Sequence, residues 1–342
     1  MTGDRPTVVV LRALGLGDFL TALPALRGVA GAFPDHRKVL AAPKGLAPLA
    51  ALSGAVDEVV NAPPPPAPLD SSLREPAVGV NLHGQGPSSH AVLLALRPDR
   101  LIAFAHTDVP ETEGFPAWRS DEHEVARWCR LLHEFGIAAD PAALDLKRPP
   151  VAAPAHAVGA IVIHPGAKDP GRRWPVERWV AVAKAAASAG SDLVVTGSPD
   201  EVPLARRICR DAGVPETAIL AGRTGLLELA AVVANARLLV ANDTGVAHLA
   251  TAFRTPSVVL FGEVSPAEWG PPPDRPIHRA IWKGPRPGAS SAELLALIEV
   301  EEVLEAIWGV APPAASGEIG TLHDGAPRTV LASAGGEGDK AG

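Results

Sequence analysis

The chain has 342 residues, and its composition is typical of a folded globular protein, with 47% hydrophobic and 20% charged residues. This composition excludes a chain that is disordered throughout, and the length predicts about two domains. The 31 basic and 38 acidic side chains give a net charge of −7, which argues against a protein that binds nucleic acid over its whole surface.

The first part of the chain alternates between short apolar runs and segments with helical periodicity. Strands are expected at 8–12, 38–43, 57–61, 77–82 and 100–105, and helices at 19–33, 45–54, 88–97 and 121–136. Such an alternation predicts a doubly wound parallel sheet. A proline run at 63–68 can be neither a helix nor a central strand, so we expect a surface loop there.

A proline-rich stretch without periodicity, at 140–156, marks the expected domain boundary. The same alternation then restarts. Strands are expected at 159–164, 192–197, 218–220, 237–241 and 257–262, and helices at 175–190, 200–213, 225–236, 244–253 and 290–309. The sequence therefore predicts domains at 1–150 and 151–311. Residues 312–342 are rich in Gly, Ala and Ser and are expected to form a disordered tail.

The cysteines and the apolar runs indicate the compartment. Cys129 and Cys209 form no metal-type spacing and are typical of reduced, buried thiols in a cytosolic protein. The N-terminus does not resemble a signal peptide, and no apolar run approaches the roughly 18 residues that a membrane span needs. We expect a cytoplasmic protein with at most peripheral contact at the inner face of a membrane.

In open α/β sheets, ligands bind beyond the carboxyl ends of the strands, so the loops that follow strands carry the functional information. The first of these loops contains Gly15, Gly17 and Asp18. It resembles the dinucleotide-binding pattern GxGxxG, but Leu20 replaces the third glycine, which argues against an NAD enzyme. Asp18 stands where a helix N-cap is expected. Both a structural cap and a carboxylate that takes a proton from a hydroxyl group remain open.

The loop after the strand at 237–241 favours an anion site. A helix that begins near Thr244 presents free N–H groups and the positive end of its dipole. Gly245 permits close approach to the backbone, and His248 lies one turn later on the same face. A phosphate group fits these donors; a capped core helix with a satisfied histidine is the alternative.

Two further loops carry charged residues. The segment 164–175 contains three cations, Lys168, Arg172 and Arg173, which favour an anionic ligand over a merely solvated loop. Glu201 follows another strand, where it could cap a helix or accept hydrogen bonds from ribose hydroxyls. The chain contains neither an HExxH motif nor an Asp-x-Asp pair, so we expect no metal cofactor.

The order of these motifs resembles glycosyltransferase family 9, whose best-known members are ADP-heptose:lipopolysaccharide heptosyltransferases. The resemblance runs from about residue 8 to 308 and rests on these stretches: VVVLRALGLGDFLTALPAL, VGVNLHG, IVIHPGAKDPGRRWPVERW, VVTGSPDE, ARLLVANDTGVAHLATAF and VVLFGEVSPAEWGP. It implies a GT-B fold, in which two Rossmann-like domains face each other across a cleft. The N-terminal domain would bind the acceptor and the C-terminal domain the nucleotide sugar.

The resemblance also implies roles for individual residues. Asp18 matches the catalytic base, and Gly15 and Gly17 belong to its loop on the acceptor side. The donor-binding positions are Asp243, Thr244, Gly245 and His248 in the DTGxxH motif, Glu201 at the ribose, and Arg172 where the family has a lysine, with Lys168 as the alternative cation. The family's aspartate in the loop at residue 81 is Asn81 here.

The resemblance implies an inverting transfer of a sugar, in the family a heptose, from a nucleoside-diphosphate donor such as ADP-heptose. The acceptor would be a hydroxyl of a saccharide or glycolipid, as in lipopolysaccharide biosynthesis. Two alternatives remain open: a sugar-nucleotide hydrolase or epimerase of the same fold, and a sugar-nucleotide-binding protein without catalysis. No nucleic-acid partner is expected.

Overall fold

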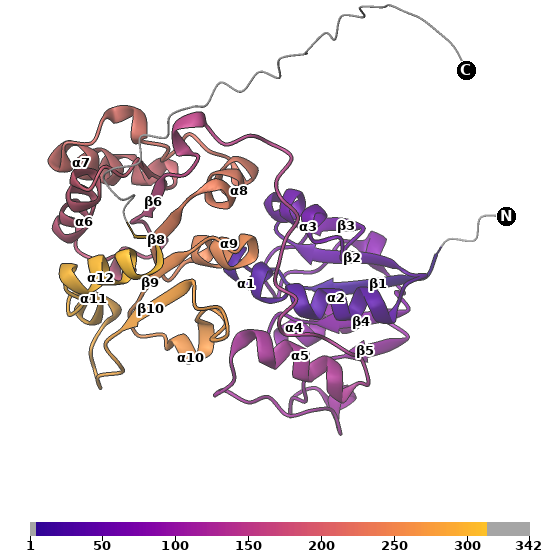
Figure 1. The fold of residues 1–342 in the computed structure, drawn as a ribbon. Coiled ribbons are helices and arrows are strands. Elements are labelled where there is room, and N and C mark those ends of the chain that lie inside the picture. The colour runs from indigo at the N-terminus through magenta and orange to yellow at the C-terminus, as the bar shows by residue number, and fades with distance from the viewer. Residues whose placement is uncertain (1–4, 313–342) are drawn as a thin grey trace, which may run out of the picture.

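The computed structural model describes residues 5–312 and contains two five-stranded parallel sheets (Figure 1). The strand orders are β3-β2-β1-β4-β5 and β10-β9-β8-β6-β7. Each sheet takes its strands from one part of the chain. We call residues 5–150 the N-terminal half and residues 151–312 the C-terminal half, and we propose residue 150 as the domain boundary. The tail expected at 312–342 lies outside the described residues, apart from Pro312.

The strands of the N-terminal half are β1 Thr7–Leu11, β2 Arg37–Ala42, β3 Glu58–Asn61, β4 Val78–Asn81 and β5 Arg100–Ile102. Its helices are α1 Leu16–Thr21, α2 Leu23–Ala32, α3 Ala47–Ser53, α4 Ser88–Leu94 and α5 Glu124–Glu134.

The strands of the C-terminal half are β6 Ile161–His164, β7 Leu193–Val195, β8 Leu238–Asn242, β9 Ser257–Phe261 and β10 His278–Trp282. Its helices are α6 Val176–Ser188, α7 Val202–Ala212, α8 Leu226–Asn235, α9 Gly245–Phe253, α10 Pro266–Trp269, α11 Ser291–Leu295 and α12 Val300–Val310.

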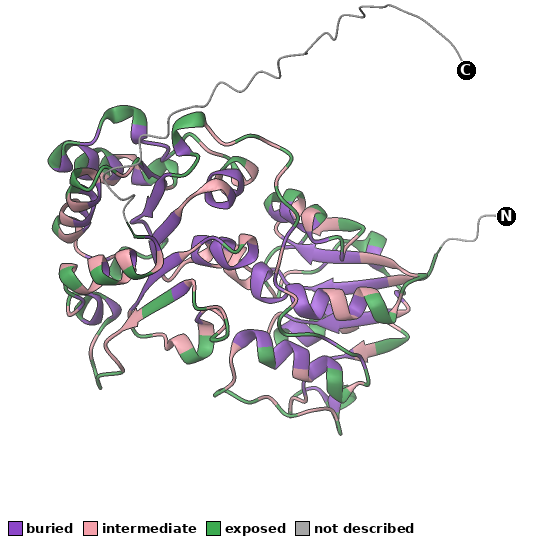
Figure 2. Cartoon of the chain, in the orientation of Figure 1, coloured by how far each residue is buried: buried purple, intermediate pink, exposed green. Residues whose placement is uncertain are grey.

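The central strands confirm the predicted parallel sheets. In β1, Val8 and Val9 are fully buried, and Val9 pairs with Val39 on β2 and with Gly79 on β4. Strands that are covered on both faces read as continuous apolar runs, as β1, β6 and β8 do. Figure 2 shows these strands as buried, with exposed residues concentrated on the outer helices and loops.

Two predicted helices are wrong in their extent. The helix expected at 19–33 is divided at Ala22, because Pro24 stands in the first turn of α2 and starts a new helix. The helix expected at 290–309 is divided into α11 and α12. There the carbonyl of Ile298 accepts hydrogen bonds from Trp174 and Arg178, and Glu299 is extended. Side chains from another part of the fold thus bind the backbone between α11 and α12, a contact that periodicity does not reveal.

The sequence analysis missed α10 and β10. α10 is a single turn, too short for a periodic pattern. β10 is an edge strand with a mixed polar sequence, and it pairs in parallel with β9 alone. Alternation and apolar content are weakest in such strands, so only the pairing identifies them.

The two halves meet directly at α1 and α9 (Figure 1). A Cβ atom added to Gly245 would lie 2.8 Å from Leu16 Cβ and 3.0 Å from the backbone nitrogen of Gly17. One buried apolar cluster contains residues of both helices, among them Leu20 on α1 and Leu249 on α9. The halves are thus closely packed at the point where the first turns of these two helices meet.

Candidate active site

Two adjoining pockets lie where the loops after the parallel strands converge. The larger pocket has a volume of about 930 Å³ and is lined by both halves. Its lining includes Gly15, Leu16, Gly17 and Asp18 from the N-terminal half, and Lys168, Arg172, Asp243, Thr244, Gly245, His248 and Trp269 from the C-terminal half. The second pocket, of about 610 Å³, is lined mainly by the C-terminal half and includes Glu201. Lys168, Thr244 and Gly245 line both pockets.

Asp18 lies in the first turn of α1, three residues after the N-cap. The N-cap itself is Gly15, so the expectation that Asp18 occupies that position is wrong. Its carboxylate oxygen Oδ2 accepts a hydrogen bond from the Gly15 N–H at 3.2 Å. The side chain is 28% exposed and lines the larger pocket. Asp18 therefore serves the helix start and still presents a carboxylate to the cleft, so the two interpretations are compatible.

The charge state of Asp18 is set by opposing influences. Burial raises the pKa of this carboxyl group above its ordinary value, the nearby Arg12 guanidinium opposes that shift, and Glu124 adds to it. A carboxylate whose pKa moves up toward neutral pH is a better proton acceptor for a hydroxyl group. The environment therefore favours a general base at this position.

The start of α9 has the geometry on which the predicted anion site depends. Thr244 is the extended N-cap residue, and Gly245 is the first residue of the helix. The Thr244 hydroxyl Oγ1 is buried and has no hydrogen-bond partner among the described residues. Burying an unpaired hydroxyl has a cost, which a ligand atom at this place would remove. This hydroxyl and the backbone N–H groups of the first turn are donors of the kind that can hold phosphate oxygens.

His248 borders the larger pocket one turn along α9, as expected from its spacing. Burial lowers its pKa to about 4, so the imidazole is neutral at pH 7 and supplies at most one N–H donor rather than a positive charge. Its ring packs edge-on against Trp269, with a centroid distance of 6.1 Å. Trp269 comes from α10, which the sequence analysis missed.

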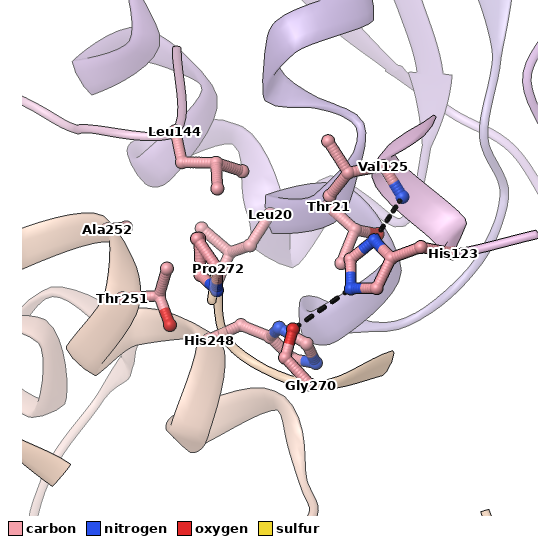
Figure 3. Close-up of a pocket in the computed structure, with 10 residues that line it drawn as sticks. All are labelled: Leu20, Thr21, His123, Val125, Leu144, His248, Thr251, Ala252, Gly270 and Pro272. Atoms are coloured by element: carbon pink, nitrogen blue, oxygen red, sulfur yellow. Dashed lines mark hydrogen bonds between the residues drawn. The ribbon is translucent and has the colours of Figure 1, made fainter. Parts of the chain in front are cut away.

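On its other side, His248 borders a small cavity of about 20 Å³ between the two halves (Figure 3). The adjacent His123 accepts the Val125 N–H at its Nδ1 atom, which leaves Nε2 to donate to the Gly270 carbonyl oxygen at 3.0 Å. This bond connects the start of α5 in the N-terminal half with the end of α10 in the C-terminal half. It holds the turn that carries Trp269.

The three cations expected at the anion site have different environments. Arg172 binds Asp243, with 2.7 Å between the guanidinium and Oδ2 and 3.0 Å to the Asp243 carbonyl oxygen. Arg173 instead turns to the Ala167 carbonyl and to Glu201. Lys168 lines both pockets and forms no ion pair with any residue in the range 5–312. Lys168 and Arg172 are therefore the cations at the larger pocket, and Arg172 offsets the negative charge of Asp243.

Glu201 fulfils the capping role considered for it, and the ribose role stays a prediction. Its Oε2 atom accepts the Ser198 N–H at 2.8 Å, and its Oε1 atom lies 3.3 Å from Arg173. A Cβ atom on Gly166 would lie 2.1 Å from Oε1, so a glycine is needed beside this carboxylate. Glu201 is buried, and it lines the second pocket.

Asn81 ends β4 and is fully buried. Its amide nitrogen lies 3.1 Å from His90 Nδ1, and His90 Nε2 lies 2.7 Å from the Phe104 carbonyl oxygen. Because that carbonyl can only accept, Nε2 carries a proton and Nδ1 accepts from Asn81. Burial lowers the pKa of His90. An uncharged amide at residue 81 thus matches a neutral histidine.

Two buried residues beside the site, Arg12 and Glu124, were not singled out in the sequence. Arg12 follows β1 directly and is 1% exposed, and Glu124 begins α5 and is 4% exposed. An arginine that ends a fully apolar strand is a signal, since a buried guanidinium needs a partner. The partner lies more than a hundred residues later in the chain, which the sequence does not indicate.

The described residues contain no group of three or more His, Cys, Asp or Glu side chains placed to hold a metal ion. Across the same range, 5–312, no helix is long and apolar enough to cross a membrane.

The fold and the site define a two-domain α/β protein in which an acidic group, the start of a helix and two cations line one pocket. The sequence pattern of the family described as "Glycosyltransferase family 9 (heptosyltransferase)" matches residues 116–287. The chain therefore belongs to glycosyltransferase family 9, as the resemblance indicated.

Individual proteins are similar to parts or to most of the chain. Lipopolysaccharide heptosyltransferase 3 of Escherichia coli is 32% identical over 126 residues, which are 36% of this chain and 36% of that protein. The chain thus matches about a third of the length of this curated relative.

Among solved structures, a family 9 glycosyl transferase from Veillonella parvula has a TM-score of 0.71 at 19% identity, covering 91% of this chain and 98% of that one. An Escherichia coli heptosyltransferase solved with ADP has a TM-score of 0.67 at 18% identity, covering 89% and 100%. These likenesses confirm the GT-B fold.

Proposed function

We propose that the protein is an inverting glycosyltransferase that moves a heptose from ADP-heptose to a hydroxyl group of a saccharide or glycolipid. The observation that carries the proposal is that Asp18 and the start of α9, which come from opposite halves, line the same pocket. The transferred sugar is inferred from the family, and the nucleotide from a solved relative that was crystallised with ADP.

In the proposed reaction, Asp18 takes the proton of the acceptor hydroxyl while that oxygen attacks the anomeric carbon of the donor. The bond from this carbon to the diphosphate oxygen breaks, and the nucleoside diphosphate leaves with the electron pair. A single displacement of this kind inverts the anomeric configuration. Proton removal by a positioned carboxylate typically contributes about 10²- to 10⁴-fold to the rate.

The departing diphosphate would be stabilised by groups that are fixed before the reaction. These are the first N–H groups of α9, the unpaired Thr244 hydroxyl, and the cations Lys168 and Arg172. His248 would add one N–H donor as a neutral imidazole. Preorganised donors aimed at developing charge are usually the largest single contribution to catalysis. Glu201, in the adjoining pocket, would accept from the ribose hydroxyls.

Donor choice is tested by thermal shift with ADP-, UDP- and GDP-sugars. A ligand that binds only the folded state stabilises it by about 2.7 kcal/mol at a concentration of one hundred times Kd. We expect ADP-heptose to raise the melting temperature most. Equal shifts with all three nucleotides would contradict the assignment of the base. A lack of any shift would contradict donor binding.

Product analysis distinguishes transfer from the hydrolase and epimerase alternatives. With ADP-heptose alone, we expect the donor to persist. With a lipopolysaccharide inner-core acceptor added, we expect ADP and a glycosylated acceptor in equal amounts. Free heptose without acceptor would instead identify a hydrolase, and an altered sugar still joined to ADP would identify an epimerase.

Turnover is expected to be independent of divalent metal ions. The positive end of α9 and the cations Lys168 and Arg172 would supply the charge stabilisation that a metal ion gives in other enzymes. Initial rates should therefore be equal with EDTA and with added Mg²⁺. Loss of turnover in EDTA that Mg²⁺ restores would overturn this proposal.

A further inference from the structure

A buried arginine lies directly beneath the candidate base. Arg12 follows β1, and its Nε atom donates to the Asp18 carbonyl oxygen at 2.9 Å. A second guanidinium nitrogen donates to the Leu82 carbonyl oxygen after β4. The third, Nη2, lies 2.7 Å from Glu124 Oε1 and 3.5 Å from Asp18 Oδ1. One side chain thus connects two strand ends, the first turn of α1, and α5.

Glu124 is held on both carboxylate oxygens. Oε1 accepts from Arg12 and from Trp128 Nε1 at 2.7 Å, while Oε2 pairs with Arg127. Burial by itself would raise the pKa of this carboxyl group, but Arg12 and these hydrogen bonds outweigh that effect and lower it. Glu124 is therefore ionised at neutral pH, and the position of the Arg12 guanidinium is fixed by a charged partner.

Stability alone does not explain this pair. Taking two charges out of water has a cost that their attraction often fails to recover, and apolar residues of similar volume can be as stable or more so. Here the pair lies next to the one carboxylate from the N-terminal half that lines the larger pocket. Its position favours a role in controlling that carboxylate.

We propose that Arg12 and Glu124 are positioning residues for Asp18: Arg12 holds the turn that carries the base and supplies the adjacent positive charge, and Glu124 holds Arg12. This inference rests on the proposed function, because it takes Asp18 to be the general base. The charged and titratable groups around Asp18 are Arg12 after β1, Glu124 on α5, and, across the pocket, Lys168, Arg172, Asp243 and His248.

The two residues should shift the titration of Asp18 in opposite directions. Arg12 lowers the pKa of Asp18 and Glu124 raises it. Arg12→Met should therefore move the Asp18 titration to higher pH, and Glu124→Gln should move it to lower pH. A neighbouring charge at this separation typically changes a pKa by about one unit or more.

The titration is measured by carbon NMR on protein labelled at the aspartate carboxyl carbons, with Asp18→Asn used to assign the signal. Glu122→Gln is the matched control, because Glu122 pairs with Arg130 at 2.5 Å near the start of the same helix and is absent from the groups that act on Asp18. We expect the control to leave the Asp18 titration unchanged. Unchanged titration in Arg12→Met and Glu124→Gln, or shifts in the same direction, would overturn the inference.

Two further measurements keep the test decisive. Circular dichroism and the thermal shift with ADP establish that each variant is folded. If Arg12→Met does not fold, Arg12→Lys replaces it; the shorter cation cannot hold both the Asp18 carbonyl and Glu124, so the titration should still move up. The acid limb of kcat against pH should follow the NMR titration, and kcat should fall about 10- to 100-fold because the base is misplaced.

This design separates the inference from the proposed function. A wild-type protein that transfers no sugar contradicts the proposed function, while opposite shifts in the NMR titration would still establish that Arg12 and Glu124 control Asp18. A wild-type protein that transfers sugar, with variants whose titration and pH profile do not move, contradicts the inference alone.

Discussion

Asp18→Asn should reduce kcat by about 10²- to 10⁴-fold while donor affinity stays close to that of the wild-type protein. The amide cannot take a proton from the acceptor hydroxyl. Its oxygen can still accept from the Gly15 N–H, so the start of α1 should be preserved. The measurements are kcat with ADP-heptose and an inner-core acceptor, and the thermal shift produced by ADP.

The comparison of the two measurements distinguishes chemistry from structure. The proposed phosphate site at the start of α9 belongs to the other half of the chain, so a base that acts only in the chemical step leaves the ADP shift intact. Parallel losses of kcat and ADP binding would identify Asp18 as a structural residue. Full activity in the variant would remove it from the mechanism.

Gly245→Ala should lower both stability and activity. Its added Cβ atom would lie 2.8 Å from Leu16 Cβ, closer than real Cβ contacts, so α1 and α9 must move apart. Overpacking of this kind typically costs about 1–3 kcal/mol. The same movement separates Asp18 from the phosphate site, and a displacement of about 1 Å can reduce turnover roughly 10²-fold. The melting temperature and kcat are the measurements.

Gly309→Ala is the matched control for this substitution. Gly309 lies in α12, and its added Cβ atom would meet nothing within 4 Å. In a helix, replacing glycine by alanine should stabilise by about 0.5–1 kcal/mol. We therefore expect melting temperatures to move in opposite directions in the two variants. If the melting temperature of Gly245→Ala rises as that of Gly309→Ala does, the contact between α1 and α9 can adjust to the added methyl group without loss of stability, which contradicts the prediction.

The parts of the fold and of the site that could be predicted are those that depend on patterns among residues close together in the sequence. The runs 8–11 and 238–241 are apolar without interruption, as buried parallel strands require, and each is followed by a glycine-containing loop that opens a helix. The carboxyl ends of parallel strands lie at one edge of a sheet. This local pattern was therefore enough to predict Asp18 and Thr244 as residues of the candidate site.

Side chains from distant parts of the fold decided the rest. Between α11 and α12, the Ile298 carbonyl accepts hydrogen bonds from the side chains of Trp174 and Arg178, more than a hundred residues earlier in the chain. Likewise, Arg173 pairs with Glu201 and lines the second pocket rather than the larger one, which its charge alone did not indicate. Periodicity and charge counts describe one segment at a time and cannot report such pairings.

By itself, the sequence determined the two parallel sheets, the loops that could bind a ligand, and the resemblance to one family, because these depend on residues close together in the chain. Only the tertiary structure decided that the Thr244 hydroxyl has no partner within residues 5–312, that His248 is neutral, and that Arg12 and Glu124 lie beneath Asp18. Burial and the partners of a charged group are properties of the packed chain. They set hydrogen bonding and pKa values, and they arise only when distant segments meet.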